Sequence, residues 1–208
     1  MANKIKFFIA QSWLLVVSAV LFGMLLAITD AAWRPRIEKN QQDKFNRIAS
    51  SLLAGAAEFQ VPKDLKKAAI DMGKGKTAKA DITKVIDAEG KHIGWAFLCQ
   101  GSGFADKIKL VAAADVSFTK IAGFGVLSSN ETPGFGDKIT VKDGFYQSQF
   151  KGMPAEQLNL KKAGDDKKID NEIIAITGAT VSSQAVVDIF NNCLPKVKEI
   201  LKQKGYLK

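Results

Sequence analysis

The chain has 208 residues, of which 47% are hydrophobic and 25% charged, as is typical of a folded globular protein. Its net charge of +9 comes from 30 lysines and arginines against 21 acidic residues. The lysines are scattered and form no stripe interleaved with aromatic residues, so nucleic-acid binding is not expected. A mean hydropathy near zero hides an asymmetry, because the first 30 residues are strongly apolar and the remainder is polar and rich in lysine.

The apolar segment at residues 7–29, FFIAQSWLLVVSAVLFGMLLAIT, contains no charged residue. About 20 apolar residues in a helix cross a hydrocarbon core of about 30 Å, so the segment predicts a single N-terminal transmembrane helix. We therefore assign residues 1–30 to the N-terminus and this helix. A cleaved signal peptide is the alternative, although its apolar region is usually only about 7–15 residues long. Basic residues flank both ends, so charge does not decide the orientation.

Residues 31–62 are predicted to form an amphipathic lead-in helix. Apolar residues recur at steps of three and four along residues 37–59, and Pro62 is expected to end the helix. The lysine- and glycine-rich run at 72–80 is predicted to be a loop. Its GKGKT sequence is not a phosphate-binding loop of the Walker type, because Ile70 stands where that motif requires glycine.

Four successive strands are predicted to form an antiparallel meander, since their connections are short. Their expected ranges are 81–87, 91–99, 107–116 and 120–128. The first two strands are predicted to form a hairpin through the turn at residues 88–90.

A last strand is predicted at residues 172–176, followed by a long helix to about Lys204 in which Pro195 should cause a kink or a new start. The expected fold class is α+β, an antiparallel sheet with flanking helices in a domain at residues 63–208.

Common hydrolytic and metal chemistries are not supported by the sequence. In QGSGF, Gln100 stands where the nucleophile elbow of a serine hydrolase has glycine. One histidine and two cysteines are too few for the four ligands of a structural zinc site. Cys99 and Cys193 are 94 positions apart, and sequence alone does not show whether they meet. We interpret them as two buried thiols rather than a disulfide.

Two segments carry the strongest functional signal. In SSNETPGFGDKI, residues 128–139, one proline and two glycines favour a tight backbone that can approach a flat ligand closely. TGATVSS, residues 177–183, lies where the last strand is expected to end and the helix to begin, and free backbone N–H groups there favour a phosphate. Either the Thr180 hydroxyl carries a ligand at this point, or Thr177 or Thr180 simply caps the helix, worth about 1 kcal/mol. The spacing alone favours capping.

TGATVSS resembles the S-G-A-T-x-[ST]-S motif of the covalent FMN-binding domain family, and ETPGFGDKI resembles the E-T-P-G-[LF]-G loop of the same proteins. Together with the single N-terminal span, the motifs resemble the G-subunit family of Rnf electron-transport complexes, ferredoxin:NAD oxidoreductases that move Na⁺ or H⁺. One alternative is an NqrC-like member of a sodium-pumping NADH:quinone reductase. The other is a membrane-anchored protein that binds a small anion without covalent flavin.

The resemblance implies that FMN is joined through its phosphate to Thr180 by a phosphoester, in a reaction that needs a flavin transferase. The residues that the resemblance implies around the attachment point are Thr177, Gly178, Ala179, Ser182 and Ser183. Those that it implies beside the flavin ring are Glu131, Thr132, Pro133, Gly134, Phe135, Gly136 and Phe104.

The resemblance also implies a role. The chain would be an electron-transfer subunit that passes electrons to other membrane subunits of a translocating oxidoreductase. Its FMN domain would lie on the extracytoplasmic (periplasmic) side of the cytoplasmic (inner) membrane, and residues 1–30 would then comprise a cytoplasmic N-terminus and the transmembrane helix.

Overall fold

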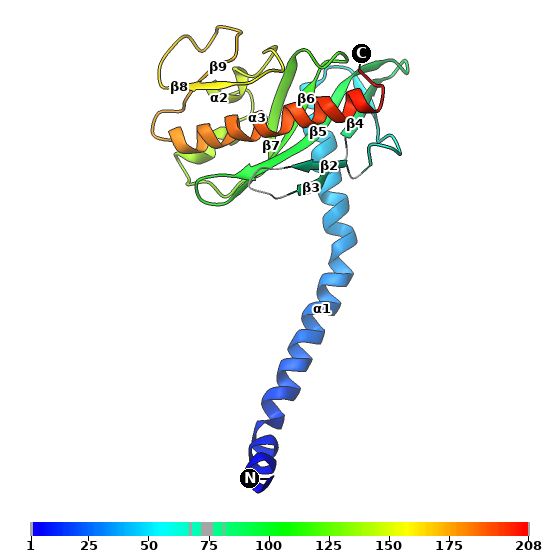
Figure 1. Ribbon diagram of the computed structural model, residues 1–208, viewed down its shortest axis with the longest axis vertical. Coiled ribbons are helices and arrows are strands. Elements are labelled where there is room, and N and C mark those ends of the chain that lie inside the picture. Colours follow the sequence, from blue (N-terminus) through cyan, green and yellow to red (C-terminus); the bar gives the residue numbers. More distant parts are fainter. Residues whose placement is uncertain (1, 67, 72–76, 81, 208) are drawn as a thin grey trace. The chain divides into compact units, whose positions relative to one another are not determined.

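A computed structural model describes residues 2–66, 68–71, 77–80 and 82–207, with side chains described for 11–66 and 82–207 (Figure 1). The chain divides into two compact units, Met1–Asp43 and Lys44–Lys208.

Helix α1, Ala2–Leu52, contains the predicted transmembrane segment. From Gln11 on, it is the one helix in the described part of the chain that is long and apolar enough to cross a membrane. The lead-in helix was predicted to reach Pro62, and this was wrong, because α1 ends at Leu52 and Ala56–Gln60 forms strand β1. The chain turns just after the helix, where the N–H of Ala56 bonds to the carbonyl oxygen of Leu53 at 3.2 Å, and Gly55 inside this turn has a φ of +85°, which glycine adopts without strain.

The second unit is built on a five-stranded antiparallel sheet with the order β1-β4-β5-β6-β7 (Figure 1). The four strands that follow β1 in this sheet are β4 (Ile82–Asp87), β5 (His92–Ser102), β6 (Lys107–Ala114) and β7 (Ile121–Ser128). Each pairs with its neighbour in the order of the chain. This confirms the predicted meander.

Two small sheets complete the strands. Antiparallel β2 and β3 cover Ala68–Asp71 and Thr77–Ala80, and parallel β8 and β9 cover Asn159–Lys161 and Glu172–Ile174. The loop predicted at residues 72–80 was therefore wrong in its second half, which is strand β3. Its first half, with most of the GKGKT sequence, lies outside the described residues.

Three helical elements follow β7: the 3-10 helix η1 (Gly136–Thr140), the short helix α2 (Phe145–Ser148) and the long helix α3 (Thr180–Gln203). The predicted terminal helix is confirmed. Pro195 lies inside α3 and does not begin a new helix. Leu194 and Val197 on either side of it are buried, and this packing compensates for the backbone hydrogen bond that proline removes.

Alternating side chains give the main sheet two covered faces, as the period of two in a strand requires. On the face toward α3 the buried cluster includes Trp95, Phe97, Cys99, Leu110 and Phe124 from the sheet and Phe190, Cys193 and Val197 from α3. On the other face Ala96, Val111 and Ala113 pack with Phe45, Ala49 and Leu53 at the end of α1. The sheet therefore holds α3, which begins with Thr180, in a fixed position.

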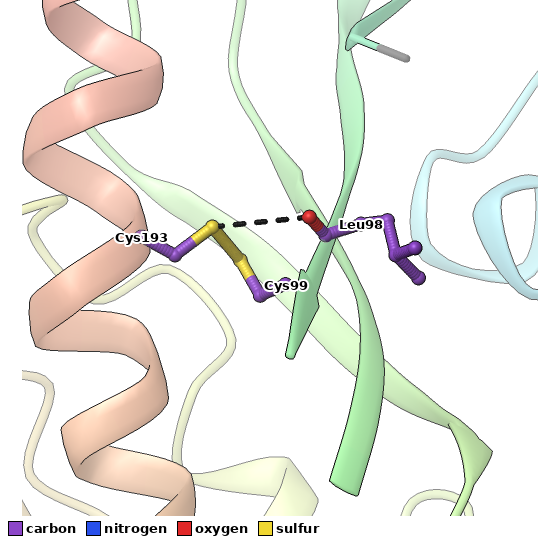
Figure 2. Close-up of a disulfide and its surroundings, with 3 residues drawn as sticks. All are labelled: Leu98, Cys99 and Cys193. Atoms are coloured by element: carbon purple, nitrogen blue, oxygen red, sulfur yellow. Dashed lines mark hydrogen bonds between the residues drawn. A yellow bond between two sulfur atoms is a disulfide. The ribbon is translucent and has the colours of Figure 1, made fainter. Parts of the chain in front are cut away.

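A disulfide joins Cys99 of β5 to Cys193 of α3, with the Cα atoms 5.9 Å apart (Figure 2). The prediction of two free thiols was wrong. Cys99 faces the α3 side of the sheet, and Cys193 belongs to the buried stripe of α3, so the packing of helix on sheet brings the sulfurs together. The sulfur of Cys193 also lies 4.0 Å from the carbonyl oxygen of Leu98, and this contact is packing because a disulfide sulfur has no proton to donate.

Candidate functional site

The two sequence motifs meet at one cavity. It has a volume of about 240 Å³, and three segments line it: the loop after β5, the loop before and at the start of η1, and the beginning of α3. The lining residues are Phe104, Thr132, Phe135, Gly136, Gly178, Ala179, Thr180, Val181 and Ser182. All of them except Val181 were predicted from the sequence to contact a cofactor. The predicted residues outside the lining are Thr177, Ser183, Glu131, Pro133 and Gly134.

The start of α3 has an exposed threonine hydroxyl and no side-chain cap. Gly178, with a φ of +80°, turns the chain into the helix, and Ala179 occupies the capping position without a side-chain hydrogen bond. Thr177 and Thr180 are exposed, and neither hydroxyl has a hydrogen bond to any residue that the structure describes. The capping interpretation of these threonines was therefore wrong. The first N–H groups of a helix carry a partial positive charge, so the cavity is suited to an anion.

The two serines of the motif have different surroundings. Ser183 is fully buried, donates a hydrogen bond to the carbonyl oxygen of Ala179 (2.9 Å), and accepts one from the N–H of Ile176 (3.0 Å). It stabilises the strand-to-helix turn and is not part of the lining. Ser182 does line the cavity, and its hydroxyl donates to the carboxylate of Glu131 at 2.5 Å.

Two aromatic rings stand at the edge of the cavity. Phe104 is 66% exposed and Phe135 is 54% exposed, although both are large apolar side chains. A Cβ atom added to Gly178 would lie 3.3 Å from the ring of Phe135, so the ring packs directly on the turn that precedes Thr180. Exposed apolar rings around a cavity are a common feature of ligand sites, where a bound molecule covers them.

The remaining predicted residues of the ETPGFG loop shape the loop rather than line the cavity. The N–H of Phe135 bonds to the carbonyl oxygen of Thr132 at 3.2 Å, closing a turn around Pro133 and Gly134. Gly134 has a φ of +77°, a conformation that side chains rarely adopt. Glu131 is buried beneath the loop.

The lining carries no lysine, arginine, aspartate or glutamate among the residues described. A dianionic phosphate monoester is usually bound with the help of arginine or lysine. A phosphodiester carries a single negative charge, which suits a neutral lining at a helix N-terminus better.

Sequence reasoning missed two buried residues, one in α2 and one just after it, that hold the strand-to-helix turn in place. The hydroxyl of Tyr146 donates to the carbonyl oxygen of Ser183 at 2.7 Å, and burial raises the pKa of this hydroxyl well above its usual value, so it stays protonated. The amide of Gln149 pairs with both backbone groups of Ile174 at 2.7 and 3.1 Å. Glutamines set among aromatic residues in GFYQSQF were the only sequence signal for these contacts.

Comparison with known proteins agrees with this geometry. The FMN-binding domain family matches residues 103–195, which include all three segments of the cavity. The G subunit of an ion-translocating oxidoreductase complex from Methanosarcina acetivorans is 29% identical over 184 residues, 88% of this chain and 90% of that protein. The G subunit of a Na⁺-translocating ferredoxin:NAD⁺ oxidoreductase complex from Acetobacterium woodii is 30% identical over 192 residues, 91% of this chain and 90% of that protein.

The chain belongs to the G-subunit family of ion-translocating oxidoreductase complexes. The crystal structure of NqrC from Shewanella oneidensis matches this family member with a TM-score of 0.53 and 25% identity, over 72% of each chain. A second structure, the C subunit of the Na⁺-translocating NADH-quinone reductase from Parabacteroides distasonis, shares the fold with a TM-score of 0.55 and 16% identity, over 79% of this chain and 96% of that one.

Proposed function

We propose that this protein is a membrane-anchored electron carrier of an Rnf-type ferredoxin:NAD oxidoreductase complex, with FMN attached covalently to Thr180. The observation that carries the proposal is the uncapped start of α3, where the Thr180 hydroxyl has no hydrogen bond to any described residue and lines the cavity. The attached flavin supplies reversible electron uptake, and the chain supplies position and electrostatics.

The residues of the cavity suit a flavin phosphodiester. Attachment forms a bond between the Thr180 oxygen and the flavin-proximal phosphorus of an activated flavin dinucleotide, and breaks the bond from that phosphorus to the bridging oxygen of the pyrophosphate. The nucleoside monophosphate leaves, the hydroxyl proton is released, and a flavin transferase would catalyse the step. The product carries one negative charge next to the first N–H groups of α3, which stabilise it without a lysine or arginine. Phe104 and Phe135 offer apolar surfaces to the flavin ring, which would cover part of their exposed area.

The disulfide supports an extracytoplasmic location for the second unit. Disulfides form and persist in oxidising compartments and are rare in the cytoplasm, where thiols are kept reduced. The Cys99–Cys193 bond lies in the core of this unit, with both cysteines almost fully buried, so it is part of the folded structure. With one N-terminal span, the N-terminus would lie in the cytoplasm and the FMN domain on the periplasmic side of the inner membrane.

The immediate partners of the carrier are proposed to be other membrane subunits of the complex. The Acetobacterium relative is named for a complex that connects ferredoxin with NAD⁺ and translocates Na⁺. This chain shows no dinucleotide-binding glycine motif after a strand, so the chemistry of NAD is assigned to another protein of the complex. Purification of the complex through a tag on this chain is expected to bring other membrane subunits with it.

In-gel flavin fluorescence tests the attachment. The chain from its native membrane should give a fluorescent band on a denaturing gel, and Thr180→Ala should abolish it. Ser182→Ala and Ser183→Ala test the neighbouring hydroxyls and should keep the band. A fluorescent band from Thr180→Ala would show that the flavin is attached to a residue other than Thr180. A dark band from the wild type would refute covalent attachment and favour a membrane-anchored protein that binds a small anion.

A further inference from the structure

We propose that Glu131 is the positioning residue of this site, because its buried carboxylate joins the three segments that line the cavity and fixes the direction of the Ser182 hydroxyl. The inference rests on the proposed flavin function, but the contacts that carry it are contacts within the chain. Glu131 itself does not line the cavity.

The carboxylate of Glu131 has a defined partner on each oxygen. Oε2 accepts the hydroxyl proton of Ser182 at 2.5 Å, and Oε1 accepts the N–H of Ala105 at 3.1 Å. The residue is 5% exposed. A buried carboxylate is costly unless hydrogen-bond donors surround it, so these two contacts are needed for the carboxylate to stay where it is.

Two glycines leave the space that the carboxylate occupies. A Cβ atom on Gly103 would overlap with Oε1 of Glu131, and one on Gly136 would lie 3.0 Å from Oε2 and 2.6 Å from the oxygen of Ser182. Real Cβ atoms do not approach other atoms at the shorter of these distances. A Cβ atom on Gly103 would also lie 2.7 Å from the backbone oxygen of Asp106, so the glycines leave space for the Glu131 carboxylate and for the backbone beside it, and the three segments close around one side chain.

Each contact of Glu131 lies next to a group that faces the cavity. Ala105 follows Phe104, Ser182 is two positions after Thr180, and Glu131 belongs to the same loop as Phe135. These contacts therefore fix the backbone of both aromatic rings and of the attachment point. They also place the hydroxyl proton of Ser182 on Glu131, so the Ser182 hydroxyl presents lone pairs and no donor to the cavity. This hydroxyl is thus suited to accept an N–H of a ligand and is unsuited to bind a phosphate.

The charge of Glu131 is expected to lower the midpoint potential of a flavin in the cavity. A negative charge one side chain away from the cavity opposes the addition of electrons to a flavin bound there. Replacement by glutamine keeps the shape and removes the charge. The amide nitrogen of glutamine at the position of Oε2 would donate to Ser182, whose proton would then be free to turn toward the cavity.

The first measurement is independent of flavin. Amide hydrogen exchange at Ala105 is compared between Thr180→Ala and the double variant Thr180→Ala/Glu131→Ala. The matched control is Thr180→Ala/Glu156→Ala, because Glu156 is exposed. Loss of a charge-assisted hydrogen bond is expected to speed exchange at Ala105 about tenfold or more, with no change in the control. Equal exchange in all three proteins would overturn the proposal.

The second measurement uses the flavin-loaded chain. Glu131→Gln is expected to raise the midpoint potential of the flavin and to change its visible spectrum, whereas Glu156→Gln should leave both as in the wild type. An unchanged potential in Glu131→Gln would overturn the electrostatic role. If Thr180→Ala retained covalent flavin, the proposed attachment would fail, while the exchange at Ala105 would still decide the role of Glu131.

Discussion

Removal of the disulfide is expected to destabilise the second unit strongly. The bond closes a loop with a sequence separation of 94. The chain-entropy relation gives about 4.7 kcal/mol for a loop of this length, and measured values are typically about 2–4 kcal/mol. We expect the double variant Cys99→Ala/Cys193→Ala to lose about 3–4 kcal/mol of unfolding free energy, because the unfolded chain is no longer constrained by the bond. Alanine is the replacement because a serine would add the cost of burying a hydroxyl.

Thermal unfolding of the full chain in detergent measures this loss. For a unit of this size, 1 kcal/mol corresponds to about 2–4 °C, so the midpoint should fall by about 6–16 °C. Reducing agent should lower the wild-type midpoint and leave the double variant unchanged. Thiol labelling of the denatured, unreduced wild type should find no free cysteine. Two reactive thiols, or a midpoint insensitive to reduction, would refute the reasoning.

The remaining predictions concern single side chains of the second unit. Tyr146→Phe should cost about 1–3 kcal/mol of stability by leaving the buried carbonyl oxygen of Ser183 without its donor, while the flavin stays attached, as calorimetry and gel fluorescence would show. Gly125→Ala should cost about 1–3 kcal/mol, because its Cβ atom would lie 2.6 Å from the side chain of Ile48, and chemical denaturation measures this. Burial lowers the pKa of His92 below 6.5, so the unfolded chain takes up the proton first and stability should fall as the pH drops below 6.5. In His92→Gln this part of the loss should disappear from the unfolding free energy measured against pH.

Much of the fold could be predicted from local sequence patterns. Alternating apolar residues and short turns predicted the meander of β4 to β7, and the apolar stripe predicted α3. The end of α1 was misjudged because apolar spacing continued through Phe59, whereas the chain turns after Leu52, with Gly55 at a positive φ, and enters β1. The pairing of Cys99 with Cys193 depends on the packing of a helix on a sheet, and no local pattern contains that information.

The candidate site, like the fold, could be predicted from the sequence only in part. The motifs lie in segments that line the cavity, and Phe104, Phe135 and Thr180 are among the lining residues, while their contact with a flavin stays a prediction. Which residues of the motifs do not line the cavity could not be predicted, because this depends on contacts between distant segments. Glu131 and Ser183 were expected beside the cofactor, but the hydrogen-bond partners of each lie within the protein.

The most direct test of covalent attachment is the mass of the peptide that contains Thr180. The chain is isolated from its native membrane, digested under denaturing conditions and fragmented in a mass spectrometer. We predict that the mass of one FMN less one water is carried by Thr180 itself. An unmodified Thr180, or the same added mass on Thr177, Ser182 or Ser183, would contradict this prediction.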